Sequence, residues 1–249
     1  MKIEYFKEYS EILGRDMEFK VFGHGGKPCI AFPTQNGRFY DYEDRGIIES
    51  MSWYIEQGRI QVFCVDSMDV ESFSAEYKDP KERIENQERY FNYIINELVN
   101  RVYEINNFNH NDSGILTFGV SLGAYHAVNC FLRRPDIFDG VLALSGVYRA
   151  EFWIKDYSSD LMFLNSPITS LSYMKHDHPY IELYKKSRII ICVGQGNWEE
   201  ECLNDTRDLD FQFHRLNIPA WVDYWGYDKP HDWPSWLEQV PYFLYHILD

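Results

Sequence analysis

The sequence predicts an α/β fold in which a mostly parallel central sheet carries helices on both faces. Short apolar runs of strand length alternate with segments of helical period along the whole chain. One such run leads through the tight turn Gly119-Val-Ser-Leu-Gly123 directly into a helix-like segment. The chain has 249 residues, 45% of them hydrophobic and 17% aromatic, so it can fill the core of a single domain over residues 1–249.

The first elements are expected to form one half of the sheet. Residues 2–9 and 17–22 alternate between apolar and polar side chains, as a pair of antiparallel edge strands does. Continuous apolar runs over 28–32 and 61–65 predict buried strands, and a crossover helix is expected between them over 46–57.

The segment 80–106 is the clearest helix of the sequence. Asp79 and Glu82 have the spacing of a capping box, and Pro80 stands at the first helical position. Apolar residues then follow at three-and-four spacing: Ile84, Phe91, Ile94, Leu98, Val102 and Ile105. Beyond the tight turn we expect strands at 140–144, 188–193 and 220–225, with helices over about 199–215 and from 234 onward.

The stretch 149–186 interrupts this alternation. It mixes aromatic and polar residues and follows the strand at 140–144, on the side of the sheet where ligand-binding loops belong. Long structured insertions are commonly lids or binding loops. We therefore expect a small cap over the active site, and a decorated surface loop is the alternative.

The turn around Ser121 has the G-x-S-x-G pattern of a nucleophile elbow, with an apolar strand before it and an amphipathic helix after it. Gly119 and Gly123 would let strand and helix approach closely around a strained serine. A serine hydroxyl becomes a strong nucleophile only when a base takes its proton, and that base needs an acid to fix its tautomer. Ser121 is therefore the expected nucleophile.

His231 is the expected base, because serine, acid and histidine follow in this order in such folds and His231 comes after the last strand. The acid should lie in the loop after the strand ending at Val193. Our order of preference is Glu199, then Glu200, then Asp205, which is expected one or two turns into the helix. The residues not used as the acid are expected to be exposed charges of an early helical turn.

The oxyanion of acyl transfer needs preorganised N–H donors. The backbone N–H of Leu122, next to the nucleophile, is one expected donor. The other should come from the loop 33–37, where we choose Gln35, with Thr34 and Asn36 as alternatives. Three residues near this site are expected to contact the substrate: Thr34, Tyr125 (which follows Ala124) and Trp233.

Charge and cysteine content limit the partners. The net charge of −15, from 39 acidic and 24 basic residues, argues against nucleic acid and membrane surfaces. No apolar run approaches the roughly 18 residues that span a bilayer, and the charged residues 1–8 have no apolar core of the length expected of a signal peptide. Five cysteines without C-x-x-C spacing suit free thiols in a reducing compartment, so we expect a cytoplasmic protein. His176-Asp177-His178 has too few ligands for a metal site, and none is assigned.

Four segments of the chain together resemble the Putative esterase family of α/β hydrolases, which includes esterase D, feruloyl and acetyl xylan esterases, enterochelin esterases and mycolyltransferases. They are Phe32-Pro-Thr34, Gly119-Val-Ser-Leu-Gly-Ala-Tyr-His126, Leu144-Ser-Gly-Val-Tyr148 and His231-Asp-Trp-Pro-Ser-Trp236. The resemblance implies an α/β-hydrolase fold and hydrolysis of a small carboxylic ester through an acyl-enzyme, without a cofactor. Some members use a glutamate as the acid, which favours Glu199 or Glu200. An acyltransferase with the same triad and a non-catalytic binding protein on this fold are the alternatives.

Overall fold

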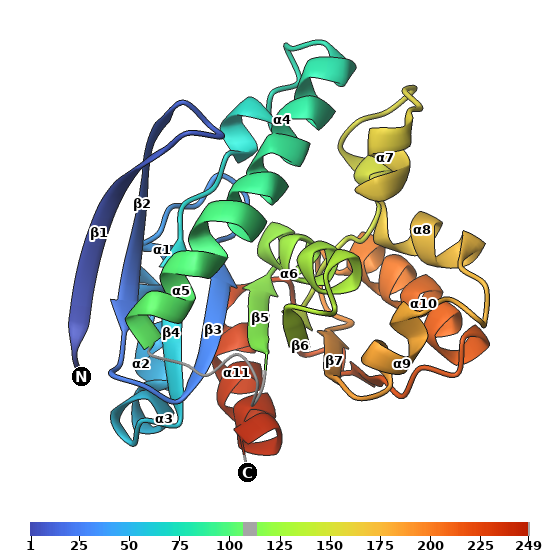
Figure 1. Cartoon of the computed structure of the whole chain (residues 1–249). Helices are drawn as coiled ribbons and strands as arrows, with labels where there is room; N and C mark the ends of the chain where they lie inside the picture. Colours follow the sequence, from blue (N-terminus) through green and yellow to red (C-terminus); the bar gives the residue numbers. More distant parts are fainter. Residues whose placement is uncertain (107–113, 249) are drawn as a thin grey trace.

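The computed structural model describes residues 1–106 and 114–248, and these form one continuous sheet covered by helices (Figure 1). Its eight strands lie in the order β1-β2-β4-β3-β5-β6-β7-β8. The expected antiparallel pair is confirmed, because β1 pairs with β2, and β2 continues antiparallel to β4. All further neighbours are parallel. The strands are β1 (Ile3–Ser10), β2 (Arg15–Phe22), β3 (Lys27–Phe32), β4 (Ile60–Val65), β5 (Ile115–Val120), β6 (Phe138–Leu144), β7 (Arg188–Val193) and β8 (Trp221–Tyr224).

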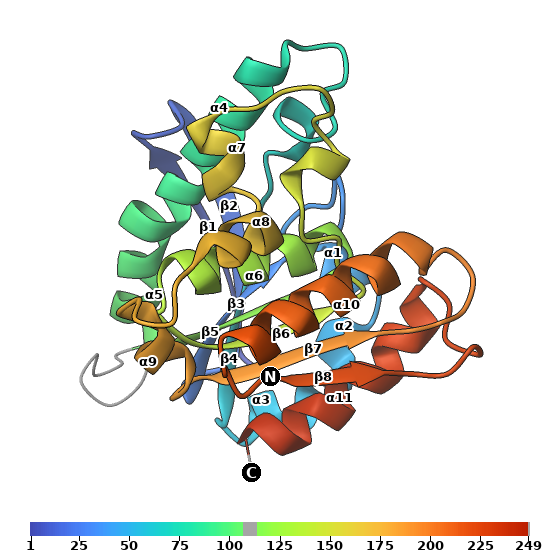
Figure 2. The ribbon, with the colours of Figure 1, turned by 90° about the vertical axis from the view of Figure 1, so that its right-hand side faces the viewer.

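Helices cover both faces of the sheet, as the sequence predicts (Figures 1 and 2). Within β3, Ile30 and Phe32 join a core cluster on one face, while Cys29 and Ala31 join a second cluster on the other. This alternation follows from the two-residue period of a strand. The first face carries α4 (Pro80–Tyr93), α5 (Val99–Asn106), α6 (Leu122–Arg133) and α10 (Glu200–Arg215), and the second carries α2 (Ile47–Ser50), α3 (Ser52–Glu56) and α11 (Trp233–Leu248).

The expected helix over 80–106 forms, with a π-helical stretch, η2 (Ile94–Leu98), between α4 and α5. Asp79 caps it by accepting a hydrogen bond from the N–H of Lys81 at 2.9 Å. Glu82 does not complete a capping box, because its carboxylate pairs with Lys78.

The crossover helix expected over 46–57 is divided into two short helices, α2 and α3, and another short helix, α1 (Asp41–Asp44), precedes them. Gly46 has a φ of 81°, which stops α1 and lets the chain turn into α2. The backbone at Met51 then separates α2 from α3.

The insertion after β6 packs against the helices α4, α6 and α10 and does not form a separate core. It contains η3 (Ala150–Phe152), α7 (Asp160–Leu164), α8 (Pro167–Tyr173) and α9 (Tyr180–Tyr184). Ile154 and Met162 are buried in one cluster with Phe73 and Leu122. The guanidinium of Arg83 ties the insertion to α4 by donating to the backbone oxygen of Trp153 at 2.9 Å.

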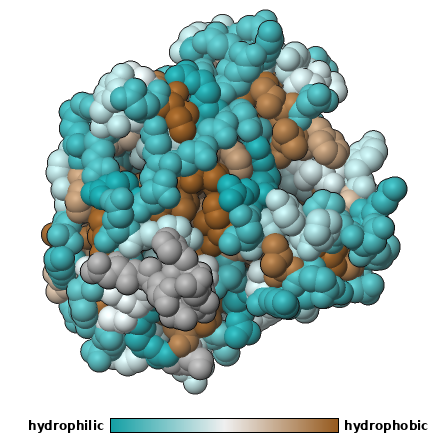
Figure 3. Space-filling model, in the orientation of Figure 1, coloured by the Kyte–Doolittle hydropathy of each residue, from teal (hydrophilic) through white to brown (hydrophobic). Residues whose placement is uncertain are grey.

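The surface agrees with the acidic, polar composition. On the face seen in Figure 3, hydrophobic side chains show in separate places between hydrophilic ones. All five cysteines are free and buried, as expected. In the described part of the chain, no helix is long and apolar enough to cross a lipid bilayer.

Candidate active site

Ser121 lies at a sharp turn between β5 and α6, with φ of 56° and ψ of −126°. A Cβ on Gly119 would lie 2.1 Å from the backbone carbon of Gly123. A Cβ on Gly123 would in turn lie 2.2 Å from the backbone oxygen of Phe32. Both glycines are therefore required for the close approach of strand, helix and the β3 loop, which is the steric reason for the G-x-S-x-G pattern.

His231 faces the serine from the loop between β8 and α11. Its Nε2 lies 2.9 Å from Ser121 Oγ, and its Nδ1 lies 3.2 Å from Glu199 Oε2. The structure thus brings together the three residues that the sequence analysis ranked first, from three separate loops. Among the described residues, no other histidine has a hydrogen bond to Ser121.

Backbone hydrogen bonds join the loop that carries His231 to the loop that carries Glu199. The N–H of His231 donates to the oxygen of Asn197 at 3.0 Å, and the N–H of Gly196 donates to the oxygen of Lys229 at 3.0 Å. A Cβ on Gly194 would lie 2.1 Å from that same Lys229 oxygen. The two glycines of the sequence Gly-Gln-Gly therefore permit a backbone contact that fixes the distance between the His231 loop and the Glu199 loop.

Glu199 is held in place by residues to which the sequence analysis gave no role. It is 1% exposed, and its Oε1 accepts a hydrogen bond of 2.6 Å from Ser145 Oγ. Ser145 Oγ also accepts a hydrogen bond of 3.1 Å from Trp236 Nε1. The ring of Trp236 stands nearly perpendicular to that of His231, with 5.0 Å between the centroids. The available signal was the position of Ser145 at the carboxyl end of a parallel strand beside the elbow.

The two alternative acids lie elsewhere. Glu200 is exposed on the first turn of α10. Asp205 is buried, and the expectation of an exposed charge is wrong for it. Its Oδ2 accepts a 2.6 Å hydrogen bond from the N–H of Tyr148, and Oδ1 pairs with Arg149. Burial raises the pKa of Asp205, while these two partners lower it. This carboxylate anchors the start of the insertion and does not contact His231.

The loop 33–37 presents one unused N–H. The N–H and hydroxyl of Thr34 both donate to Asp41 Oδ2, at 3.2 and 2.6 Å. The N–H of Asn36 donates to Asp69 Oδ2 at 3.2 Å. Within residues 1–106 and 114–248, the N–H of Gln35 has no hydrogen-bond partner. Gln35 is therefore the free backbone donor of this loop, and the Thr34 hydroxyl, expected to contact substrate, is already engaged.

A buried histidine ties this loop to the elbow helix. His126 on α6 is 1% exposed, and its Nε2 lies 3.1 Å from Oδ1 of Asp69, the same carboxylate that holds Asn36. Nothing in the sequence indicates this contact, because Asp69, in the short 3-10 helix η1 (Asp69–Glu71), is 57 residues from His126 in the chain.

One expected substrate contact is wrong, and another stays a prediction. Tyr125 is fully buried, and its hydroxyl donates to the backbone oxygen of Asn165 at 2.7 Å. Trp233 is partly buried, with its ring against Tyr42 and Trp236, and its contact with substrate stays a prediction. The helical period after the elbow turns Tyr125 into the core, so its ring has no surface left for a substrate.

An open cavity lies beside the oxyanion loop. It has a volume of about 520 Å³ and is lined by Gln35, Glu76, Arg83, Phe152, Trp153 and Lys155. These residues come from the loop after β3, the segment before α4, α4 itself and the insertion, and the insertion contributes half of the lining.

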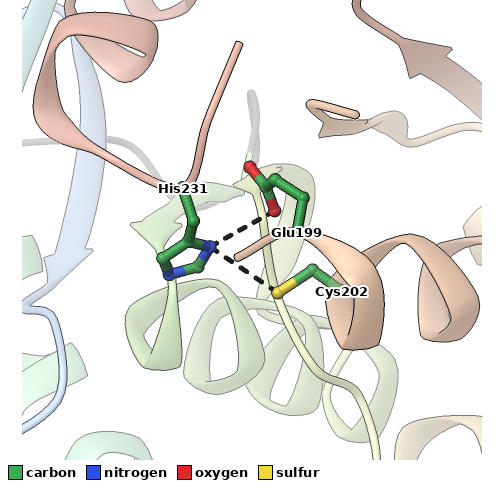
Figure 4. Close-up of side chains that lie close together, drawn as sticks. All are labelled: Glu199, Cys202 and His231. Carbon is green, nitrogen blue, oxygen red and sulfur yellow. Dashed lines mark hydrogen bonds and ion pairs between the residues drawn. The ribbon is translucent and has the colours of Figure 1, made fainter. Parts of the chain in front are cut away.

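Cys202, on the first turn of α10, lies against His231 and Glu199 (Figure 4). Its Sγ lies 3.7 Å from His231 Nδ1 and donates to the backbone oxygen of Ser145 at 3.2 Å. Burial, and then the nearby carboxylate of Glu199, raise the pKa of this thiol. In the described part of the chain, Glu199, Cys202 and His231 form the one group of three side chains whose ligand atoms are close enough to hold a metal ion.

Comparisons with known proteins agree with this architecture. A ferulic acid esterase structure is 14% identical with a TM-score of 0.77, and covers 99% of this chain and 98% of its own. S-formylglutathione hydrolase from Staphylococcus aureus is 17% identical with a TM-score of 0.73, covering 100% and 97%. MPT51 from Mycobacterium tuberculosis is 13% identical with a TM-score of 0.76, covering 100% and 98%. At these identities, the likeness establishes the α/β-hydrolase fold.

A sequence comparison with proteins of curated function finds no match. The family model described as Putative esterase, by contrast, matches residues 10–244, which is nearly the whole chain. The chain therefore belongs to the Putative esterase family of α/β hydrolases, a family of carboxylic ester hydrolases.

Proposed function

We propose that this protein is a serine carboxylesterase that cleaves a small ester through an acyl-enzyme. One observation carries the proposal: Ser121 Oγ, His231 and Glu199 form a continuous chain, with 2.9 Å between Oγ and Nε2 and 3.2 Å between Nδ1 and Oε2. Both distances are those of hydrogen bonds, as expected between a nucleophile and its base and between that base and an orienting acid.

In the first half-reaction, Ser121 Oγ attacks the ester carbonyl carbon while His231 Nε2 takes the hydroxyl proton. Glu199 keeps the other proton on Nδ1, so that Nε2 is free to accept, and its charge stabilises the imidazolium. The carbonyl oxygen becomes an oxyanion, for which we assign the N–H groups of Leu122 and Gln35 as donors. The imidazolium then returns its proton to the leaving alcohol, and the acyl group remains on Oγ.

In the second half-reaction, water replaces the alcohol. His231 Nε2 takes a proton from the water as its oxygen attacks the acyl carbon, and then returns that proton to Ser121 Oγ. A carboxylic acid leaves and the free serine is restored. No cofactor is needed for either step.

We place the substrate next to the oxyanion loop, in the cavity of about 520 Å³ that Gln35 and the insertion line. This assignment makes the segment 149–186 a cap of a single α/β-hydrolase domain. Mixed aromatic and charged walls suit a soluble ester with both an apolar and a polar part. Five free, buried thiols suit a reducing compartment, and we propose a cytoplasmic location.

The proposed chemistry is tested with a fluorophosphonate probe and short-chain nitrophenyl esters. The wild-type protein should be labelled on Ser121 and should hydrolyse the esters, because the probe reacts with an activated serine. Ser121→Ala should abolish labelling and lower turnover by about 10⁴-fold or more. Unlabelled wild-type protein, or a Ser121→Ala variant with normal turnover, would refute the proposal. Addition of an alcohol acceptor separates hydrolysis from acyl transfer.

A further inference from the structure

The proposed triad contains a second chemical arrangement on the side of the histidine that faces away from Ser121. Glu199, Cys202 and His231 present a carboxylate oxygen, a sulfur and a ring nitrogen that all lie within 4.8 Å of one another. Figure 4 shows the three side chains converging from the start of α10 and from the loop before α11. The reaction proposed above uses Glu199 and His231 but leaves Cys202 without a role.

These separations match those between ligands of one small cation. Zinc lies about 2.3 Å from sulfur and about 2.0 Å from nitrogen or oxygen in tetrahedral sites, which places neighbouring ligand atoms about 3.3–3.6 Å apart. Nδ1 lies 3.2 Å from Oε2 and 3.7 Å from Sγ. One thiolate, one imidazole and one carboxylate also form a donor set that zinc prefers over magnesium or calcium.

The site lies beneath one partly exposed side chain and has a rigid frame. The His231 side chain is 20% exposed and the Glu199 side chain 1% exposed, so a cation can enter past the histidine. Ser145 fixes the carboxylate from behind, and the backbone contact between His231 and Asn197 fixes the ring. Little rearrangement is therefore needed to bring the three ligand atoms onto one ion.

We propose that Glu199, Cys202 and His231 bind a zinc-like divalent cation and that this binding switches the esterase off. The inference rests on the proposed function for its effect on activity, but not for the binding itself. The cation takes the lone pair of Nδ1, so the ring proton must sit on Nε2. An Nε2–H donates to Ser121 Oγ and cannot accept its proton, so the base is lost. Cys202 releases its thiol proton to solvent as the sulfur–metal bond forms.

The activity test compares the full-length protein with two cysteine variants and one matched control. Cys202→Ala removes the ligand, and Cys202→Ser keeps a donor for the Ser145 oxygen without a thiolate. Cys130→Ala removes another free, buried thiol, on α6. Each protein is freed of metal with EDTA, kept in a reductant that has no thiol, and titrated with Zn²⁺ during nitrophenyl ester hydrolysis. Every rate is normalised to the same protein without metal.

We expect kcat/KM of the wild-type protein and of Cys130→Ala to fall at least about tenfold, which corresponds to about 1.4 kcal/mol, and to recover with EDTA. Both Cys202 variants should keep their metal-free rate at the same Zn²⁺ concentration. Equal inhibition of the wild-type protein and the Cys202 variants would overturn the proposal, because the cation would then act elsewhere.

A second measurement does not depend on activity. Co²⁺ is added to Ser121→Ala, and the absorption band of a cobalt–thiolate bond is recorded with and without the additional change Cys202→Ala. The band should appear only when Cys202 is present. If the wild-type protein hydrolyses no ester but this band appears, the metal site stands and the esterase proposal falls. If esters are hydrolysed and no Cys202-dependent band forms, the metal site falls alone.

Discussion

Replacement of Glu199 by glutamine tests the role of the acid with almost no change in shape. Glu199 is 1% exposed, accepts from Ser145 Oγ at 2.6 Å and lies 3.2 Å from His231 Nδ1. If the amide oxygen of Gln faces Nδ1, its NH₂ meets the Ser145 hydroxyl, which must then give up its own donor contact. If the NH₂ faces Nδ1, the ring proton moves to Nε2 and the base is lost.

Neither orientation keeps the negative charge that stabilises the imidazolium. An acid-to-amide change of this kind in a catalytic triad lowers kcat by about 10⁴-fold, which corresponds to roughly 5.4 kcal/mol of transition-state stabilisation. We therefore expect Glu199→Gln to lose about this much kcat on a short-chain nitrophenyl ester, with little change in KM and in the thermal unfolding midpoint.

The matched control is Glu200→Gln, one residue along the chain. Glu200 is exposed at the start of α10, where a charge contributes only about 0.3–1 kcal/mol through the helix dipole. This variant should keep wild-type kcat. A Glu199→Gln variant with more than about a tenth of wild-type kcat would refute the assignment of the acid.

Three further outcomes are expected. The double variant Ser121→Ala/His231→Ala should lose little more activity than either single variant, because the two residues act in one step; additive losses in nitrophenyl ester assays would contradict this. Ser145→Ala leaves a buried carboxylate oxygen without its donor, and a hydrogen bond to a charged group contributes about 1.5–3 kcal/mol, so kcat should fall on the order of tenfold to a hundredfold. An unchanged kcat would remove Ser145 from the support of the acid. Gly123→Ala places a Cβ 2.2 Å from the Phe32 oxygen, so the unfolding midpoint should fall by an amount equivalent to about 1–3 kcal/mol or more; a wild-type midpoint in thermal denaturation would show that the elbow is less tightly packed.

Elements whose pattern is local could be predicted from the order of residues alone. Alternating apolar residues and continuous apolar runs predicted every strand of the sheet. The two-residue period of a strand places successive side chains on opposite faces, and this period can be seen in the sequence. The elbow could also be predicted, because its two glycines are required by contacts within five residues of the chain and with the adjacent strand. Chain order then sufficed to select His231 as the partner of Ser121 across 110 residues.

The three acid candidates can be distinguished only by their positions in the folded chain. Glu199, Glu200 and Asp205 lie within seven residues, at the start of α10. Their spacing in the sequence does not predict which of them faces the histidine. A positive φ of 70° at Trp198 and the backbone contacts of the histidine loop turn Glu199 inward. Asp205 is drawn instead to Arg149 and the N–H of Tyr148, partners more than fifty residues away.

The same limit explains the other differences. Three side chains from different elements lie around His231 and Glu199, and their spacing in the chain does not predict that they come together. They are Ser145, Trp236 and Cys202. Tyr125 stands beside the nucleophile in sequence, yet the rotation of α6 buries it. Local periodicity predicts which face of an element a side chain occupies. What surrounds that face depends on how distant elements pack, and this packing places Glu199, Ser145 and Cys202 around His231.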